Sequence, residues 1–141
     1  SWVQGAWALW VGGYSGDKDS IFGVTVGGRR TEMEGADGIV GWFINSLPLA
    51  LNVDPSASPQ AFLKQVWEAN HQIREYEFAP LVDIHRWSHF PAGVELFDSL
   101  FVFENAPLEY DEDTEAPTFE LAGITNRTPT YYPITVVFYP T

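Results

Sequence analysis

The stretch WVQGAWALWV (2–11) limits most strongly how this chain can fold. It contains no charged residue and is apolar on nearly every side of a helix, and Gly12-Gly13 follow it, as glycine often follows the last turn of a helix. A helix that is apolar all round is normally buried all round. A chain of 141 residues seldom provides that much cover. We therefore expect a helix over 2–11 that is fully buried, with help from a neighbouring surface.

The same stretch bears on where the protein resides. It lacks a basic region before it and is too short to span a bilayer, so it predicts neither a signal peptide nor a membrane helix. The chain begins with Ser1 and enters directly into apolar sequence, which suggests a piece of something longer. Absence of cysteine excludes a disulfide framework and a thiolate zinc site, and is compatible with the cytoplasm, where we expect the protein to be.

The charge excludes further partners. A formal net charge of −12 argues against nucleic acid, whose phosphates are bound by Lys and Arg, and against anionic membrane surfaces. Aromatic residues make up 16% of the chain, which favours a large internal or inter-domain surface.

Hydrophobic periodicity predicts an α+β chain forming one unit over 1–141. The clearest element is a helix with Ser58 as N-cap and Pro59 at its first position, which stops before Pro80. One amphipathic face of this helix has residues at spacings of four and three: Phe62, Val66, Ala69, Ile73 and Tyr76.

Short apolar runs between turn residues predict the strands. Pro48 favours a sheet edge or a strand start for the strand over 47–53. We expect further strands at 21–26, 96–105, 118–122 and 134–139, a short helix at 81–87, a polar connection at 27–38 and an acidic loop at 107–117.

Candidate sites are few. His85 and His89 are four residues apart, but two histidines without a third ligand seldom bind a metal, and surface or cap positions are the simpler interpretation, so no metal site is expected. No Gly-X-Ser-X-Gly or thiol nucleophile is present. Arg29 and Arg30 follow a buried strand, where a buried arginine would need a carboxylate. A pair of surface arginines is the alternative.

Three segments in order resemble the C-terminal lobe of a condensation domain from a nonribosomal peptide synthetase. Gly27-Gly28-Arg29 stands where that family has a strand followed by Ser-Gly-Arg. Residues 40–48, VGWFINSLP, are similar to its Val-Gly-X-Phe-Val/Ile-Asn-Thr-Leu-Pro segment. Residues 97–105 match a strand of the type Phe-Asp-X-X-Phe-Val-Phe-X-Asn. The resemblance covers nearly the whole chain.

Several departures leave the subtype open. The segment after the long helix, 74–81, differs from the family's His/Asn-Gln-Asp-X-Pro-Phe-Glu pattern. Trp42 is closer to epimerization domains, whereas Asn45 and the following Leu-Pro favour condensation. The catalytic His-His-X-X-X-Asp-Gly motif is absent from this sequence, so no catalytic residue is expected here and the chain alone should be inactive. A related epimerization or ester-forming domain, or a non-catalytic binding or assembly module, is the alternative.

The resemblance implies one lobe of the two-lobed chloramphenicol acetyltransferase-like fold, with an active-site tunnel between the lobes. It implies amide-bond formation between donor and acceptor thioesters carried on the phosphopantetheine arms of two carrier proteins, with no cofactor bound directly. The implied partners are the N-terminal lobe, the donor and acceptor carrier proteins and an adjacent adenylation domain.

The resemblance also assigns residues. Arg29 would pair with the motif Asp of the other lobe and organise the active site. Asn105 would face the tunnel on the acceptor side, although a strand-end cap is an equal alternative. The floor loop between the lobes would contain Gly41, Trp42, Phe43, Asn45 and Ser46. Gly41 would permit the bend, Trp42 and Phe43 would pack across the lobes, and Asn45 would satisfy backbone groups at the crossing.

Overall fold

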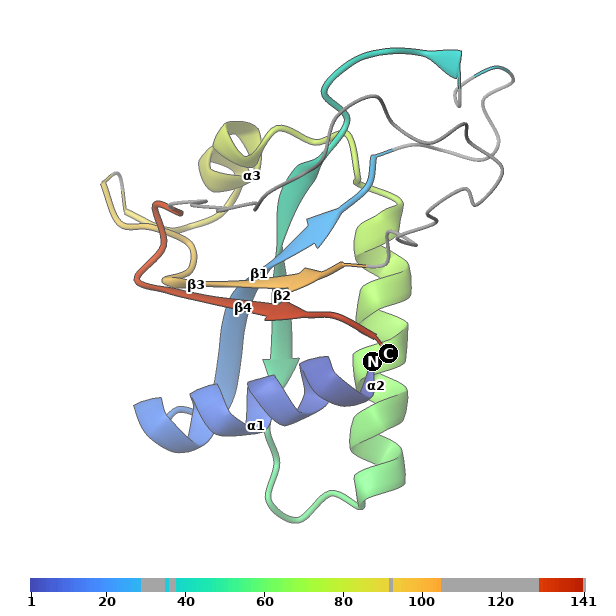
Figure 1. The fold of residues 1–141 in the computed structure, drawn as a ribbon. Coiled ribbons are helices and arrows are strands. Elements are labelled where there is room, and N and C mark those ends of the chain that lie inside the picture. Colours follow the sequence, from blue (N-terminus) through green and yellow to red (C-terminus); the bar gives the residue numbers. More distant parts are fainter. Residues whose placement is uncertain (29–34, 36–37, 92, 105–129, 141) are drawn as a thin grey trace, which may run out of the picture.

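The structure of the protein is a computed structural model, which describes residues 1–28, 35, 38–91, 93–104 and 130–140. Three helices and four strands lie in these residues (Figure 1). In chain order they are α1 (Trp2–Ser15), β1 (Asp19–Val26), β2 (Asn45–Asn52), α2 (Pro59–Arg74), α3 (Leu81–Trp87), β3 (Ser99–Phe103) and β4 (Ile134–Phe138). The strand expected at 118–122 and the acidic loop at 107–117 lie outside the described residues.

The four strands form one mixed sheet in the order β2-β1-β3-β4. β1 and β2 are antiparallel, from Asp19 opposite Asn52 to Val26 opposite Asn45. β3 lies parallel to β1, and β4 lies parallel to β3. Pro48 is thus in a strand at the edge of the sheet, as predicted, where its missing N–H breaks no ladder.

The main core lies between one face of this sheet and the helices α1 and α2. Alternate residues of β1 and β2 point into it, so the strands have the period of two expected for one buried face. Its buried members are Ala8, Phe22, Val24, Leu47, Leu49, Leu51, Phe62, Val66 and Phe101.

Helix α2 begins as its sequence predicts. The Ser58 hydroxyl accepts a hydrogen bond from the Ala61 N–H at 3.2 Å, and Pro59 occupies the first turn. Phe62 and Val66 are buried, and Ala69 and Ile73 pack beside them. The predicted extension to Tyr76 was wrong, because the helix ends at Arg74 and Tyr76 lies in a turn, 61% exposed.

Helix α1 differs from the prediction in length and in burial. It continues through Gly12 and Gly13 to Ser15, and ends at Gly16, whose φ of 76° is the left-handed conformation of a helix C-cap. Only Gly5, Ala8 and Gly12 are buried in it. The prediction of full burial was therefore wrong for this chain.

An aromatic row runs along α1 from Trp7, which packs against the main core, to Trp10 and Tyr14 in solvent. Trp7 stacks on Trp10 with ring centroids 4.9 Å apart, and Trp10 stacks on Tyr14 at 5.6 Å. Trp10 is 51% and Tyr14 84% exposed. One turn of spacing between these residues places them along one side of the helix.

No helix in the part of the chain that the structure describes is long and apolar enough to cross a membrane.

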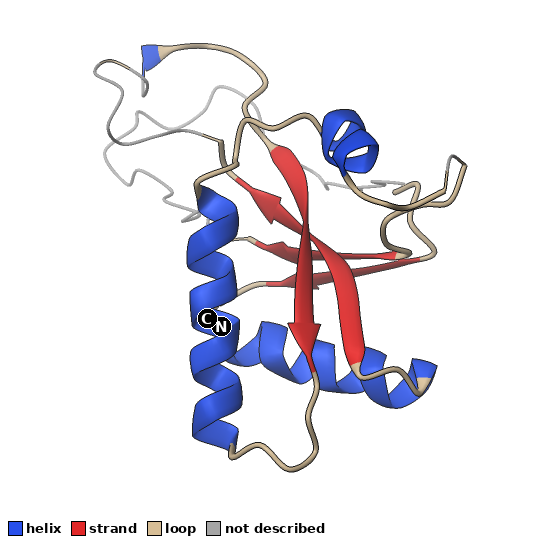
Figure 2. Cartoon of the chain, turned by 180° about the vertical axis from the view of Figure 1, so that it is seen from behind, coloured by secondary structure: helices blue, strands red, loops and turns tan. Residues whose placement is uncertain are grey.

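A smaller core covers part of the opposite face of the sheet. Leu96, Phe97 and Leu100 are buried there, against Leu81 and Ile84 of α3 among others. Figure 2 shows α3 apart from α1 and α2, at the end of the sheet where β2 begins. Gly23 permits this packing, because a Cβ at Gly23 would overlap the Phe97 ring.

Candidate functional site

The segment 40–48 divides into an open half and an anchored half. Val40 is 98% and Trp42 93% exposed, so two large apolar side chains stand in solvent directly before β2. From Asn45 onward the segment is strand β2 and pairs with β1. The prediction of a loop over the whole segment was wrong for Asn45 and Ser46, which start this strand. Gly41 lies against the Phe43 ring, which a Cβ would approach within 3.3 Å.

Asn45 joins the start of β2 to the turn between α2 and α3. Its side-chain Nδ2 donates to the carbonyl oxygens of Glu77 and Ala79, at 2.9 Å each. Its Oδ1 accepts from the Ser46 N–H at 2.9 Å. One part-buried amide thus satisfies three backbone groups, as expected for a residue that serves the backbone. All three partners lie in this chain.

Gly28, of the Gly27-Gly28-Arg29 motif, lies against the segment 40–48. Its φ is 64°, and a Cβ there would overlap the carbonyl oxygen of Phe43. Only glycine combines this conformation with this approach. Gly28 and Phe43 therefore lie side by side, although the polar connection after β1 separates them in sequence.

The third motif forms β3, beside β1. Val24 lies opposite Phe101 in these parallel strands, so β1 and β3 end at the same edge of the sheet. Arg29 and Asn105 follow the two strands in sequence, but both lie outside the described residues, as does Arg30. The roles expected for Arg29 and Asn105 stay predictions.

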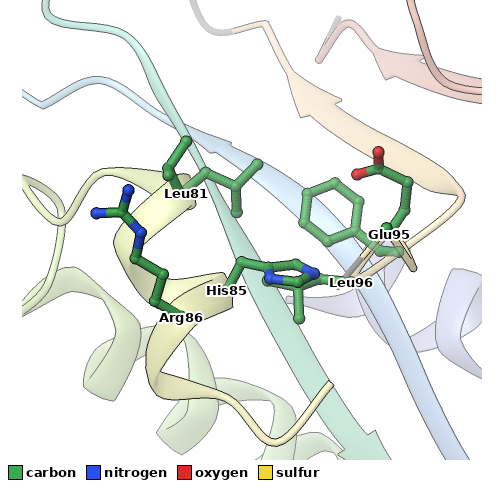
Figure 3. A pocket seen from close by; sticks show the side chains of 8 residues that line it. Leu81, His85, Arg86, Glu95 and Leu96 are labelled. Carbon is green, nitrogen blue, oxygen red and sulfur yellow. The ribbon is translucent and has the colours of Figure 1, made fainter. Parts of the chain in front are cut away.

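A pocket lies between α3 and the loop that leads into β3 (Figure 3). Its volume is about 350 Å³. Figure 3 shows Arg86 and Glu95 on opposite sides of it, with His85 between them. The lining residues are Leu81, Val82, His85, Arg86, Gly93, Glu95, Leu96 and Phe97. Sequence reasoning missed this pocket, because α3 and the loop 93–97 come together only in the fold, and Phe97 was interpreted as part of a strand.

The two histidines do not form a pair. Helix α3 ends at Trp87, so His89 lies beyond it and does not share a helical face with His85. His85 hydrogen bonds through Nε2 to the Val94 carbonyl oxygen at 2.7 Å. Among the described residues, no group of three His, Cys, Asp or Glu side chains could hold a metal ion.

A four-stranded mixed sheet with α1 and α2 on one face and α3 on part of the other is an arrangement found in known proteins. Solved structures show the same fold, that of condensation domains in the CoA-dependent acyltransferase class. A starter condensation domain of rhizomide synthetase superposes with a TM-score of 0.63 and 22% identity, over 72% of this chain and 23% of that one. The first condensation domain of the calcium-dependent antibiotic synthetase gives 0.62 and 23%, over 74% and 22%. The α+β fold prediction is confirmed.

The chain belongs to the condensation domain family, whose model matches residues 2–141. A linear gramicidin synthase polypeptide from Brevibacillus parabrevis is 39% identical over 138 residues, which are 98% of this chain and 2% of that protein. Chondramide synthase cmdD from Chondromyces crocatus is 44% identical over 137 residues, 97% of this chain and 4% of that protein. This chain therefore spans only a few hundredths of the length of these relatives. The prediction of the family is confirmed.

Proposed function

We propose that this chain is the C-terminal lobe of a condensation domain in a nonribosomal peptide synthetase. The complete domain would form an amide bond, by attack of the amine of an acceptor aminoacyl thioester on a donor thioester. The family match over 2–141 carries this proposal. The chain corresponds to 23% and 22% of the solved chains that contain condensation domains, which supports a part of a domain.

The lobe assignment rests on the motifs present and absent. The catalytic His-His-X-X-X-Asp-Gly motif does not occur in this sequence, whereas three segments typical of the C-terminal lobe follow one another in order. In this assignment Arg29 pairs with the motif Asp of the N-terminal lobe, and Asn105 faces the acceptor side of the tunnel. The chain alone would be inactive.

The exposed half of 40–48 would then contact the N-terminal lobe. Val40 and Trp42 are almost fully exposed in this chain, and large apolar side chains in solvent commonly mark a surface that a partner covers. Asn45 would hold the base of this segment through its bonds to Glu77 and Ala79. The further partners would be the donor and acceptor carrier proteins, which present their substrates on phosphopantetheine, and an adjacent adenylation domain. The complete domain would be located in the cytoplasm.

The test is reconstitution. The chain is mixed with the separately expressed N-terminal lobe encoded upstream of it, together with aminoacylated donor and acceptor carrier proteins, and dipeptidyl product on the acceptor is measured by mass spectrometry. We expect no product from either lobe alone and product from the mixture. Trp42→Ala should reduce product formation. Trp67→Ala is the matched control, because Trp67 is a 60% exposed tryptophan on α2.

The alternatives give other products. Loss of stereochemical purity in the donor without bond formation would indicate an epimerization domain, and product only with a hydroxyacyl acceptor would indicate an ester-forming domain. Absence of turnover in a mixture whose two lobes demonstrably bind each other would contradict the catalytic proposal and leave a binding or assembly module.

A further inference from the structure

The pocket between α3 and the loop 93–97 has the size and lining of a small-molecule site. Its volume of about 350 Å³ lies at the lower end of the range for such sites, roughly 300–1,000 Å³. Leu81, Leu96 and Phe97 provide apolar walls, and Leu96 and Phe97 are themselves buried. Nothing in the proposed function uses this pocket.

The charges around the pocket do not balance. Arg86 already has a partner, because its Nη1 donates to Asp83 Oδ1 at 3.1 Å within α3. Glu95, on the opposite side, makes no hydrogen bond or ion pair with the described part of the chain. The net charge of the chain is −12, so its long-range field also attracts cations. Asp83 balances the charge of Arg86, so the unbalanced charge beside the pocket is the Glu95 carboxylate.

The neighbouring polar groups favour the same sign. A carbonyl oxygen only accepts, so the His85 Nε2 carries the hydrogen that reaches Val94, and in this tautomer Nδ1 is left as an acceptor. Tyr132 stacks on the Phe97 ring with centroids 5.1 Å apart. The pKa of Tyr132 is raised, first by burial and second by the charge of Glu95. The negative charge of Glu95 therefore acts on Tyr132, which stacks on the Phe97 wall of the pocket.

We propose that this pocket binds a small primary ammonium ion with a compact, branched apolar body. The ammonium group pairs with the Glu95 carboxylate, and the apolar body lies against Leu81, Leu96 and Phe97. A carboxylate ligand is disfavoured, because it would approach Glu95 and find Arg86 already paired with Asp83. The inference goes beyond peptide-bond formation and does not depend on it.

The test compares three probes of the same shape on the whole chain: 3-methylbutylamine as its hydrochloride, 3-methylbutan-1-ol and 3-methylbutanoate. Binding is followed by amide chemical-shift changes of 81–87 and 93–97 in ¹H–¹⁵N spectra. We expect the amine to bind more tightly than the alcohol, and the carboxylate least tightly. Glu95→Gln should weaken binding of the amine about two- to fivefold, the size expected for an exposed ion pair. It should leave the affinity for the alcohol unchanged.

The control variant is Asp98→Asn, which removes an exposed carboxylate that does not line the pocket. It should leave all three affinities unchanged, and so separates a local contact from the general field of an acidic protein. Equal loss of amine binding in Asp98→Asn and Glu95→Gln would overturn the proposal. So would tighter binding of the carboxylate, or shift changes outside the two segments. Since the readout is binding, its failure would leave the reconstitution experiment unaffected.

Discussion

Replacement of Asn45 tests whether the start of β2 is held by one side chain. Asn45→Ala removes both hydrogen bonds to the carbonyls of Glu77 and Ala79, and the one from the Ser46 N–H. A typical hydrogen bond contributes about 1 kcal/mol net, and a buried group left without a partner costs about 1–3 kcal/mol. Because the site is only part-buried, water replaces some of this loss. We expect the free energy of unfolding to fall by about 2–3 kcal/mol.

Asn52 is the matched control, since it stands at the other end of the same strand. Its Nδ2 donates to Asp19 Oδ1 at 2.7 Å, but on an exposed surface. Asn52→Ala should therefore cost less than about 1 kcal/mol. The assay is urea unfolding followed by far-UV circular dichroism, with equal m-values required of both variants. Losses within about 0.5 kcal/mol of each other would refute the reasoning, because burial and the number of bonds would then not decide the cost.

Asn45→Asp keeps the shape of the side chain but removes its two hydrogen-bond donors. The carboxylate keeps the acceptor for the Ser46 N–H but places oxygen where Nδ2 donates, 2.9 Å from each of two carbonyl oxygens. This repulsion raises the pKa of the new carboxyl in the folded protein. A raised acid pKa means that the folded state binds the proton more tightly, so the destabilisation is largest above the folded pKa and diminishes as pH falls through it. A loss of stability that does not change with pH would contradict this account.

Three further predictions concern backbone space and charge. Gly28→Ala should destabilise the protein by about 1–3 kcal/mol, because the new Cβ would strain a residue with φ 64° against Phe43. Gly13 lies within α1 and has open space around it, so Gly13→Ala should be neutral or stabilise by about 0.5–1 kcal/mol. Thermal unfolding measures both variants. Gly23→Ala should destabilise by about 1–3 kcal/mol through overlap with Phe97, and a smaller side chain at 97 should recover part of that loss in a double-mutant cycle. The pKa of Asp54 is lowered from 3.8, first by the hydrogen bond from the Ser56 backbone N–H and second by the hydrogen bond from the Ser56 hydroxyl. The contribution of Asp54 to stability is therefore present above pH 3.8 and is lost as pH falls through the pKa of the folded state. Ser56→Ala should raise the pKa of Asp54 in an NMR titration, and an unchanged pKa would refute the assignment.

Local sequence patterns predicted the structure correctly where a residue type has one main structural role. Ser58 and Pro59 predicted the start of α2, and Pro48 predicted an edge strand, because capping and a missing N–H depend on few neighbours. The short helix 81–87 was predicted with its observed bounds. The strand at 96–105 was predicted too long, since Leu96 and Phe97 are apolar for another reason: they pack below α3, before β3 begins at Ser99.

Burial and long-range contact were not predictable in this way. The hydrophobicity of α1 identified a helix but did not show which side is covered, and Gly12 was interpreted as a terminator although it allows close packing on Val53. Nothing in 40–49 indicated that Asn45 would reach Glu77 and Ala79, more than thirty residues away. The pocket of Figure 3 likewise depends on two segments that meet only when Gly23 admits Phe97.

Two of the exposed apolar areas in the described part of the chain, the aromatic row on α1 and the segment 40–44, lie at opposite ends of β1. Helix α1 precedes Asp19 by a short turn, and the open segment 40–44 precedes Asn45, which is opposite Val26. Eight strand residues separate these ends by roughly 23 Å, at about 3.3 Å per residue. Helix α1 and the segment that leads into β2 thus lie at opposite ends of β1 (Figure 1). Substitutions at Trp42 and at Trp10 consequently report on different surfaces, and an effect of the first on reconstitution is not evidence about the second.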